Sequence, residues 1–86
     1  SGKAQGDTRG ERDHKTLFQE WAQRHRALTP RYELRETEGP DHARVFRVAL
    51  FLGDEAFTEG EGRSKTEAEQ DAARRAMVEA VGQPPG

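Results

Sequence analysis

The stretch GEGRSKTEAEQDAARRAMVEAVG, residues 60–82, contains the start, the apolar face and the end of one predicted helix. Ser64 and Glu67 have the spacing of a capping box, in which the two side chains satisfy amides that a helix start leaves unpaired. Gly82 ends the helix in the usual way. The apolar face is nearly all alanine: Ala68, Ala72, Ala76 and Ala80, flanked by Ala73, Met77 and Val81. Such small side chains let a helix lie very close to a sheet.

The start of this helix also has features that favour binding of an anion. Free backbone amides and the positive end of the helix dipole coincide there with the basic residues Arg63 and Lys65. Gly60 and Gly62 are expected to let the backbone come close to a ligand. A plain turn from strand to helix explains the same residues, so both interpretations stay open.

Residues 14–28 have the period of a second amphipathic helix, which Asp13 can cap and Pro30 should stop. Its apolar side contains Leu17, Phe18, Trp21, Ala22 and Leu28. Its opposite side carries hydrogen-bonding side chains with little charge: Thr16, Gln19, Glu20 and Gln23. A face that is merely solvated usually carries more Lys and Glu, so this polar stripe is a candidate binding surface. An ordinary solvent-facing surface remains the alternative.

The segment between the helices alternates as a three-stranded antiparallel meander does. Strands are predicted over residues 31–37, 45–52 and 55–58. Gly39-Pro40-Asp41-His42 forms the first loop, and Gly53-Asp54 a tight hairpin. In the second strand, Val45 and Phe51 are expected to point away from the helices. The predicted fold is therefore α+β, in the order α-β-β-β-α.

Length and composition limit the remaining possibilities. A chain of 86 residues makes one domain at most, which we place at residues 14–82. Residues 1–13 are too polar to bury surface and are expected to be a flexible tail, and residues 83–86 a disordered end. No apolar run is long enough for a membrane span. The absence of cysteine fits a reducing compartment, and we expect the cytoplasm.

Catalytic and metal sites are not expected in this chain. Phe51-Leu52-Gly53-Asp54 looks like the signature of a ribonuclease III active site, but there the acidic residues lie on a helix, whereas here Asp54 follows a strand. His14, His25 and His42 have no metal-like spacing and no cysteine partners. The sequence therefore predicts neither a catalytic residue, nor a bound metal, nor a cofactor.

Three segments carry a resemblance to a known family: DHKTLFQEWAQ, the GPDH loop and GEGRSKTEAEQDAARRA. They resemble the double-stranded RNA-binding domain, most closely the one at the carboxyl end of bacterial ribonuclease III. The resemblance implies that the two helices pack on one face of the sheet. It also implies recognition of an A-form duplex across two successive minor grooves and the phosphates between them.

The resemblance assigns a role to each segment. Thr16, Gln19, Glu20 and Gln23 are expected to face the first minor groove, while Pro40, Asp41 and His42 enter the second. Arg63, Ser64 and Lys65 are expected to hold the phosphates between the grooves. The parent enzyme is expected to be a homodimer through a catalytic domain that is absent from this chain.

Two departures from the family weaken the expected affinity. The family often has basic residues where this chain has Thr66 and Glu69, and the net charge is −2. Three functional classes therefore remain: an RNA-binding module, a protein-interaction or dimerisation module of the same fold, and a nuclease. An exposed apolar surface around Val45 and Phe51 would favour the second class.

Overall fold

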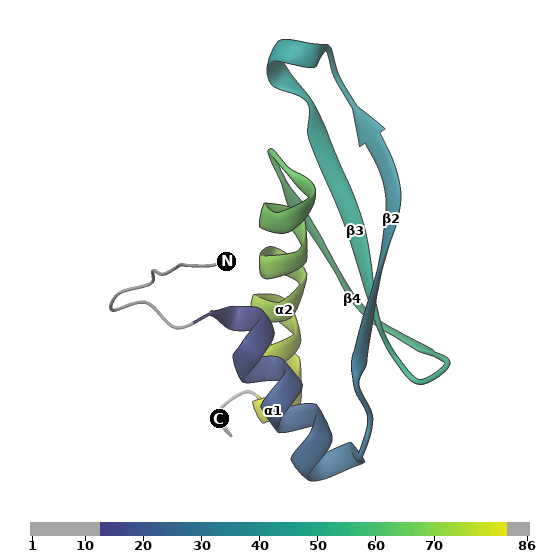
Figure 1. Cartoon of the computed structure of the whole chain (residues 1–86), viewed down its shortest axis with the longest axis vertical. Coiled ribbons are helices and arrows are strands. Elements are labelled where there is room, and N and C mark those ends of the chain that lie inside the picture. The colour runs from purple at the N-terminus through teal and green to yellow at the C-terminus, as the bar shows by residue number, and fades with distance from the viewer. Residues whose placement is uncertain (1–12, 83–86) are drawn as a thin grey trace.

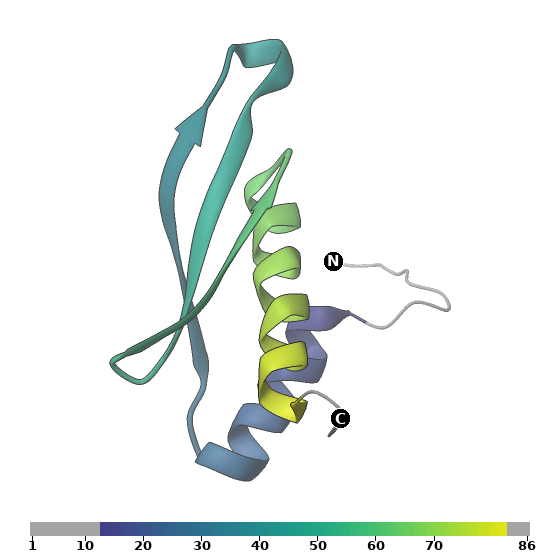
Figure 2. The same ribbon diagram turned by 180° about the vertical axis from the view of Figure 1, so that it is seen from behind.

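The computed structural model describes residues 13–82. Its elements are α1 (His14–Arg26), β2 (Pro30–Glu38), a short 3-10 helix η1 (Asp41–Ala43), β3 (Val45–Leu52), β4 (Glu55–Gly62) and α2 (Lys65–Val81). The strands form one antiparallel sheet in the order β2-β3-β4. Both helices lie on one side of this sheet, as the opposite views in Figures 1 and 2 show. The predicted α-β-β-β-α architecture is confirmed. The expected tail and carboxyl end, residues 1–12 and 83–86, lie outside the described residues.

The central strand β3 supplies the sheet's share of the core. Val48, Leu50 and Leu52 are buried, and the last two belong to one cluster with residues of both helices. Strand β3 has the predicted bounds, and β2 is one residue longer at each end than predicted. Gly53, with a φ of +61°, turns the chain into β4, so that Leu52 pairs with Glu55. The predicted tight hairpin is confirmed.

Strand β4 is longer than the sequence predicted, and its glycines have a packing role. It continues to Gly62 instead of ending at Thr58, and Gly60 is buried. A Cβ at Gly60 would lie 2.2 Å from the Ala72 amide nitrogen, and one at Gly62 would lie 2.6 Å from the Glu67 Cβ. These glycines let β4 pack directly on α2. The expectation that they also bring the backbone close to a ligand stays a prediction.

Helix α2 has the ends and the buried face that its sequence predicted. The Ser64 hydroxyl oxygen accepts a hydrogen bond from the Glu67 amide at 3.1 Å. Glu67 in turn accepts from the Arg63 amide at 2.9 Å. Four alanines of the apolar face are fully buried: Ala68, Ala72, Ala73 and Ala76. At the other end Val81 is 65% exposed, so the apolar face stops short of the last turn.

Helix α1 begins as predicted but ends earlier. Asp13 caps it by accepting from the Lys15 amide at 3.3 Å, and Phe18 is fully buried. The helix ends at Arg26 because Ala27 adopts a left-handed conformation with a φ of 58°. Pro30 therefore begins β2 and does not stop the helix. Leu28, which was expected on the helix's apolar side, lies beyond its end and is 37% exposed.

The face of the sheet that points away from the helices is partly covered by charged side chains. The Arg31 guanidinium lies 4.5 Å from the centroid of the Phe51 ring. Phe51 and Val45 are half-buried, and Ala49 between them is only 4% exposed. The large apolar side chains that are exposed lie beyond the end of α1, on β2 and in the last turns of α2: Leu28, Leu34, Val78 and Val81. Neither Val45 nor Phe51, around which an exposed apolar surface would favour a protein-interaction module, is among them.

Candidate nucleic-acid interface

The three predicted contact segments lie at successive places along the long axis of the fold. Helix α1 lies toward one end, the tip of the β2–β3 hairpin forms the other, and the start of α2 lies between them (Figure 1). The chain therefore places a candidate phosphate-binding segment between two candidate groove-binding segments. This order is the one that the resemblance requires.

The polar stripe of α1 is exposed. All four of its residues are accessible: Thr16, Gln19, Glu20 and Gln23. The Thr16 hydroxyl donates to the Asp13 carboxylate at 3.1 Å, and the Gln23 amide donates to the Thr29 hydroxyl at 3.0 Å. These local bonds orient the two ends of the stripe. These hydrogen-bonding side chains, of which only Glu20 carries a charge, suit hydroxyl groups and base edges in a minor groove.

The β2–β3 loop is a hydrogen-bonded turn. Gly39 has a φ of +91°, and η1 follows, closed by a hydrogen bond from the Ala43 amide to the Pro40 carbonyl at 2.8 Å. A Cβ at Gly39 would also lie 2.7 Å from the Ala43 carbonyl oxygen. The side chains of Pro40, Asp41 and His42 are exposed. The loop therefore presents these side chains from a fixed backbone.

The start of α2 presents Arg63, Ser64 and Lys65 to solvent. The Ser64 hydroxyl oxygen already accepts the Glu67 amide, so this side chain orients the helix start as well as facing outward. Arg63 and Lys65 are long, exposed cations on either side of this cap. Cations beside a helix amino terminus suit binding of a phosphate.

Arg63 also joins the start of α2 to the β2–β3 loop. Its guanidinium donates to the His42 carbonyl oxygen at 3.2 Å. Beside it lies a hollow of about 320 Å³ that is also lined by Asp41, Arg44 and Phe46. Arg44 pairs with Asp41 at 2.5 Å and brings a further cation to this hollow. No local sequence pattern indicated the contact between Arg63 and His42, because these two positions are 21 residues apart.

The start of α2 is joined to α1 as well. Lys15 pairs with Glu69 at 2.6 Å, and Lys65 pairs with the same carboxylate at 3.1 Å. Burial by itself would raise the pKa of Glu69, but hydrogen bonds and charge from the two lysines lower it below the ordinary value. From the sequence, Glu69 was recognised only as an acidic residue at a position where the family often has a basic one, and Lys15 was not identified as a candidate.

Tyr32, which belongs to β2, lies beside Lys15. The Lys15 ammonium is 4.9 Å from the centroid of the Tyr32 ring. Burial, followed by the charges of Glu69 and Asp13, raises the pKa of Tyr32 to about 12. The phenol therefore stays protonated and neutral at any physiological pH.

The residue considered for catalysis lies in an exposed turn. Asp54 is exposed at the β3–β4 hairpin. Among residues 13–82, no group of three or more His, Cys, Asp or Glu side chains could hold a metal ion. Within the same residues, neither helix is both long and apolar enough to cross a membrane.

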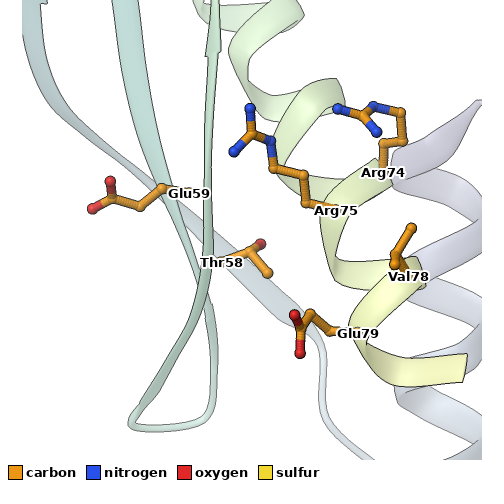
Figure 3. Close-up of a pocket in the computed structure, with 6 residues that line it drawn as sticks. All are labelled: Thr58, Glu59, Arg74, Arg75, Val78 and Glu79. Carbon is orange, nitrogen blue, oxygen red and sulfur yellow. The ribbon is translucent and has the colours of Figure 1, made fainter. Parts of the chain in front are cut away.

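A surface groove of the protein lies between β4 and α2, away from the three contact segments (Figure 3). Thr58 points across it toward α2 and donates to the Ala72 carbonyl oxygen at 2.8 Å, whereas Glu59 points the opposite way. Arg74 and Arg75 border this groove, and both pair with Asp71, at 2.7 Å and 3.1 Å. These two arginines are therefore already neutralised in part by a carboxylate on their own helix.

Residues 14–78 match the family model of the double-stranded RNA binding motif. The chain belongs to this family. Among solved structures, the chain is similar to a structure of Arabidopsis HYL1. That structure was described for its molecular implications for miRNA processing. That structure has a TM-score of 0.67 and 33% identity, over 80% of this chain and 97% of the other. The second dsRBD of DRB4 has a TM-score of 0.58 and 32% identity, over 81% and 97% of the two chains.

Full-length relatives of this double-stranded RNA-binding domain are bacterial. Ribonuclease 3 of Myxococcus xanthus is 48% identical over 68 residues, which are 79% of this chain and 26% of that protein. Ribonuclease 3 of Heliobacterium modesticaldum is 46% identical over 70 residues, 81% of this chain and 30% of that protein. The chain thus spans less than a third of the length of these curated relatives. The predicted family is confirmed, and so is the predicted similarity to bacterial ribonuclease III.

Proposed function

We propose that this double-stranded RNA-binding domain serves as the substrate-binding part of a ribonuclease III. It binds the shape of an A-form duplex and cleaves nothing itself, and it uses no metal or cofactor. In the parent enzyme it holds RNA for a separate catalytic domain, through which two copies form a homodimer. The proposed compartment is the cytoplasm.

The observation that carries this proposal is the central place of the α2 start. This segment is hydrogen-bonded to the β2–β3 loop through Arg63, and its first turns are paired with α1 through Glu69. Two groove-binding segments are thus held at a set spacing on either side of the phosphate-binding segment. A fixed spacing of this kind supports recognition of duplex shape, since successive minor grooves recur at a spacing that differs between A-form and B-form helices.

A gel-shift comparison of matched duplex RNA, duplex DNA and single-stranded RNA tests the proposal. Duplex RNA should bind much more tightly than the other two, because duplex DNA lacks the 2′-hydroxyls that the polar stripe is expected to contact and single-stranded RNA lacks the groove spacing of an A-form duplex. Gln19→Ala should weaken duplex RNA binding by roughly 0.5–1.5 kcal/mol, the contribution of one ordinary hydrogen bond, with little change in salt dependence. Equal affinity for duplex RNA and duplex DNA would contradict the proposal.

The same protein sample distinguishes the other two classes. Sedimentation without RNA would reveal a stable dimer if the domain were chiefly a protein-interaction module. Incubation of duplex RNA with magnesium would reveal cleavage if the chain were itself a nuclease. We expect a monomer and intact RNA.

A further inference from the structure

Glu69 lies between two lysines that come from different helices. Its two carboxylate oxygens accept from Lys15 of α1 at 2.6 Å and from Lys65 of α2 at 3.1 Å. The Glu69 side chain is only 11% exposed, whereas the two lysine side chains are 35% and 56% exposed. The carboxylate therefore lies beneath the two ammonium groups, and a ligand that approaches from solvent meets the lysines first.

We propose that Lys15 and Lys65 form one phosphate-binding site across the two helices, and that Glu69 is its internal counter-ion. This inference rests on the proposed function, and its ligand is a backbone phosphate of duplex RNA. In the free protein the Glu69 carboxylate pairs with both ammonium groups, so an RNA phosphate has to compete with this carboxylate for the two lysines. Lys15 thereby supplies a cation near the position where the family often has one and this chain has Glu69. Glu69 at the same time limits the affinity of the site.

Other contacts hold Lys15 in place independently of the carboxylate charge. The Lys15 amide donates to the Gln70 side-chain oxygen at 3.3 Å, and the Gln70 side chain also bonds to Asp13. The Lys15 ammonium lies over the Tyr32 ring. These contacts join the start of α1 to α2 and β2. Replacing Glu69 by the isosteric glutamine should therefore remove the charge while both lysines remain at the surface.

The first test compares Glu69→Gln with Glu79→Gln. Glu69→Gln should tighten binding of duplex RNA roughly fivefold, the effect of one unit charge about 4 Å away in a water-like dielectric. It should also steepen the dependence of log K on log salt, by up to about one unit if a further phosphate contact forms. Glu79→Gln makes the same charge change near the other end of the same helix, beside the groove in Figure 3. It should leave both quantities near those of the parent protein.

The second test asks whether Lys15 belongs to the site. In the Glu69→Gln background, Lys15→Met should reverse most of the gain in affinity and flatten the salt dependence again. If Lys15→Met leaves RNA binding of that background unchanged, Lys15 is not a phosphate ligand and the two-lysine site is overturned. A Lys15→Arg variant, which keeps the charge, should retain most of the gain.

Thermal unfolding without RNA tests the ion pair, and RNA binding of the parent separates failure of this inference from failure of the proposed function. Glu69→Gln and Lys15→Met should each lower the melting temperature, and the double variant should lose less than the two losses together. If the parent binds duplex RNA and Glu69→Gln has the parent's affinity and salt dependence, the counter-ion role is overturned while the function stands. If the parent does not bind duplex RNA, the proposed function is overturned and this site with it.

Discussion

Gly60 is the residue at which helix α2 and strand β4 approach too closely for any side chain. An added Cβ would lie 2.2 Å from the Ala72 amide nitrogen and 2.4 Å from the Ala68 carbonyl oxygen. Both are backbone atoms, so neither can move aside by changing a rotamer. The buried alanines on α2 and the glycine on β4 together make this close packing possible.

Gly60→Ala should therefore destabilise the fold. The helix has to shift away from the sheet, and overpacking of this kind typically costs about 1–3 kcal/mol. Glu59→Ala is the matched control, because Glu59 is the exposed neighbour in the same strand, and its effect should stay within about 0.5 kcal/mol. Urea unfolding measures both variants. If Gly60→Ala were as stable as the parent, α2 would not pack on β4 in this way.

Residues whose role is local were predictable from the sequence, and residues whose role depends on a distant partner were not. Asp13, Ser64 and Glu67 act within four residues of their partners, so spacing alone indicated the two caps. The spacing around Gly60 could not reveal a helix that packs against it. The ion pair between Lys15 and Glu69 joins residues 54 positions apart, and no local pattern encodes it.

Helix α2 and strand β4 are also joined by the half-buried carboxylate of Asp71. Asp71 accepts from the Glu61 amide at 3.0 Å, and it pairs with Arg74 and Arg75. Burial alone would raise the pKa of Asp71, but the Glu61 amide and the two arginines lower it below 3.8. Because β4 is an edge strand, this bond satisfies a backbone amide that would otherwise face solvent. The strand itself continues past the end that alternation predicted because Gly60, Glu61 and Gly62 pair with residues of β3.

Asp71 should make the stability of the fold depend on acid pH. A carboxyl group whose pKa is lower in the folded state stabilises fully above its unfolded value, and this stability is lost as pH falls through the lower folded value. Asp71→Asn should therefore be less stable than the parent at neutral pH, and the difference should shrink as the pH falls below about 3.8. Urea unfolding across this range measures it. Asp54→Asn, in the exposed hairpin turn, is the control. A difference that stays constant with pH would exclude this role.

The three contact segments act together only if the fold keeps them at one spacing. The predicted order of elements was enough to place them on the same domain, but it did not show that Arg63 contacts the loop or that Glu69 contacts α1. These two contacts make the start of α2 the common point of the interface. They also explain how a chain with a net charge of −2 can present cations to a duplex, since Arg63 and Lys65 flank the helix start and Lys15 shares the Glu69 carboxylate with Lys65.

Binding should therefore depend on duplex length. Domains of this family span about 16 bp, so a duplex of that length reaches both groove-binding segments and the phosphates between them. A duplex of about half that length can reach only one groove-binding segment, and it should bind far more weakly and with a shallower salt dependence. Titrations with duplexes of increasing length at fixed salt measure this.

A second duplex of about 16 bp with a shuffled sequence is the control for that series, and it should bind as tightly as the first because shape is what is recognised. A short duplex offers fewer overlapping positions at which the domain can bind. Its affinity is therefore compared with that of the longer duplexes after correction for the number of these positions. If the corrected affinity does not change with length, only one segment contacts RNA. The bond from Arg63 to the His42 carbonyl would then stabilise the hairpin tip without contributing to recognition.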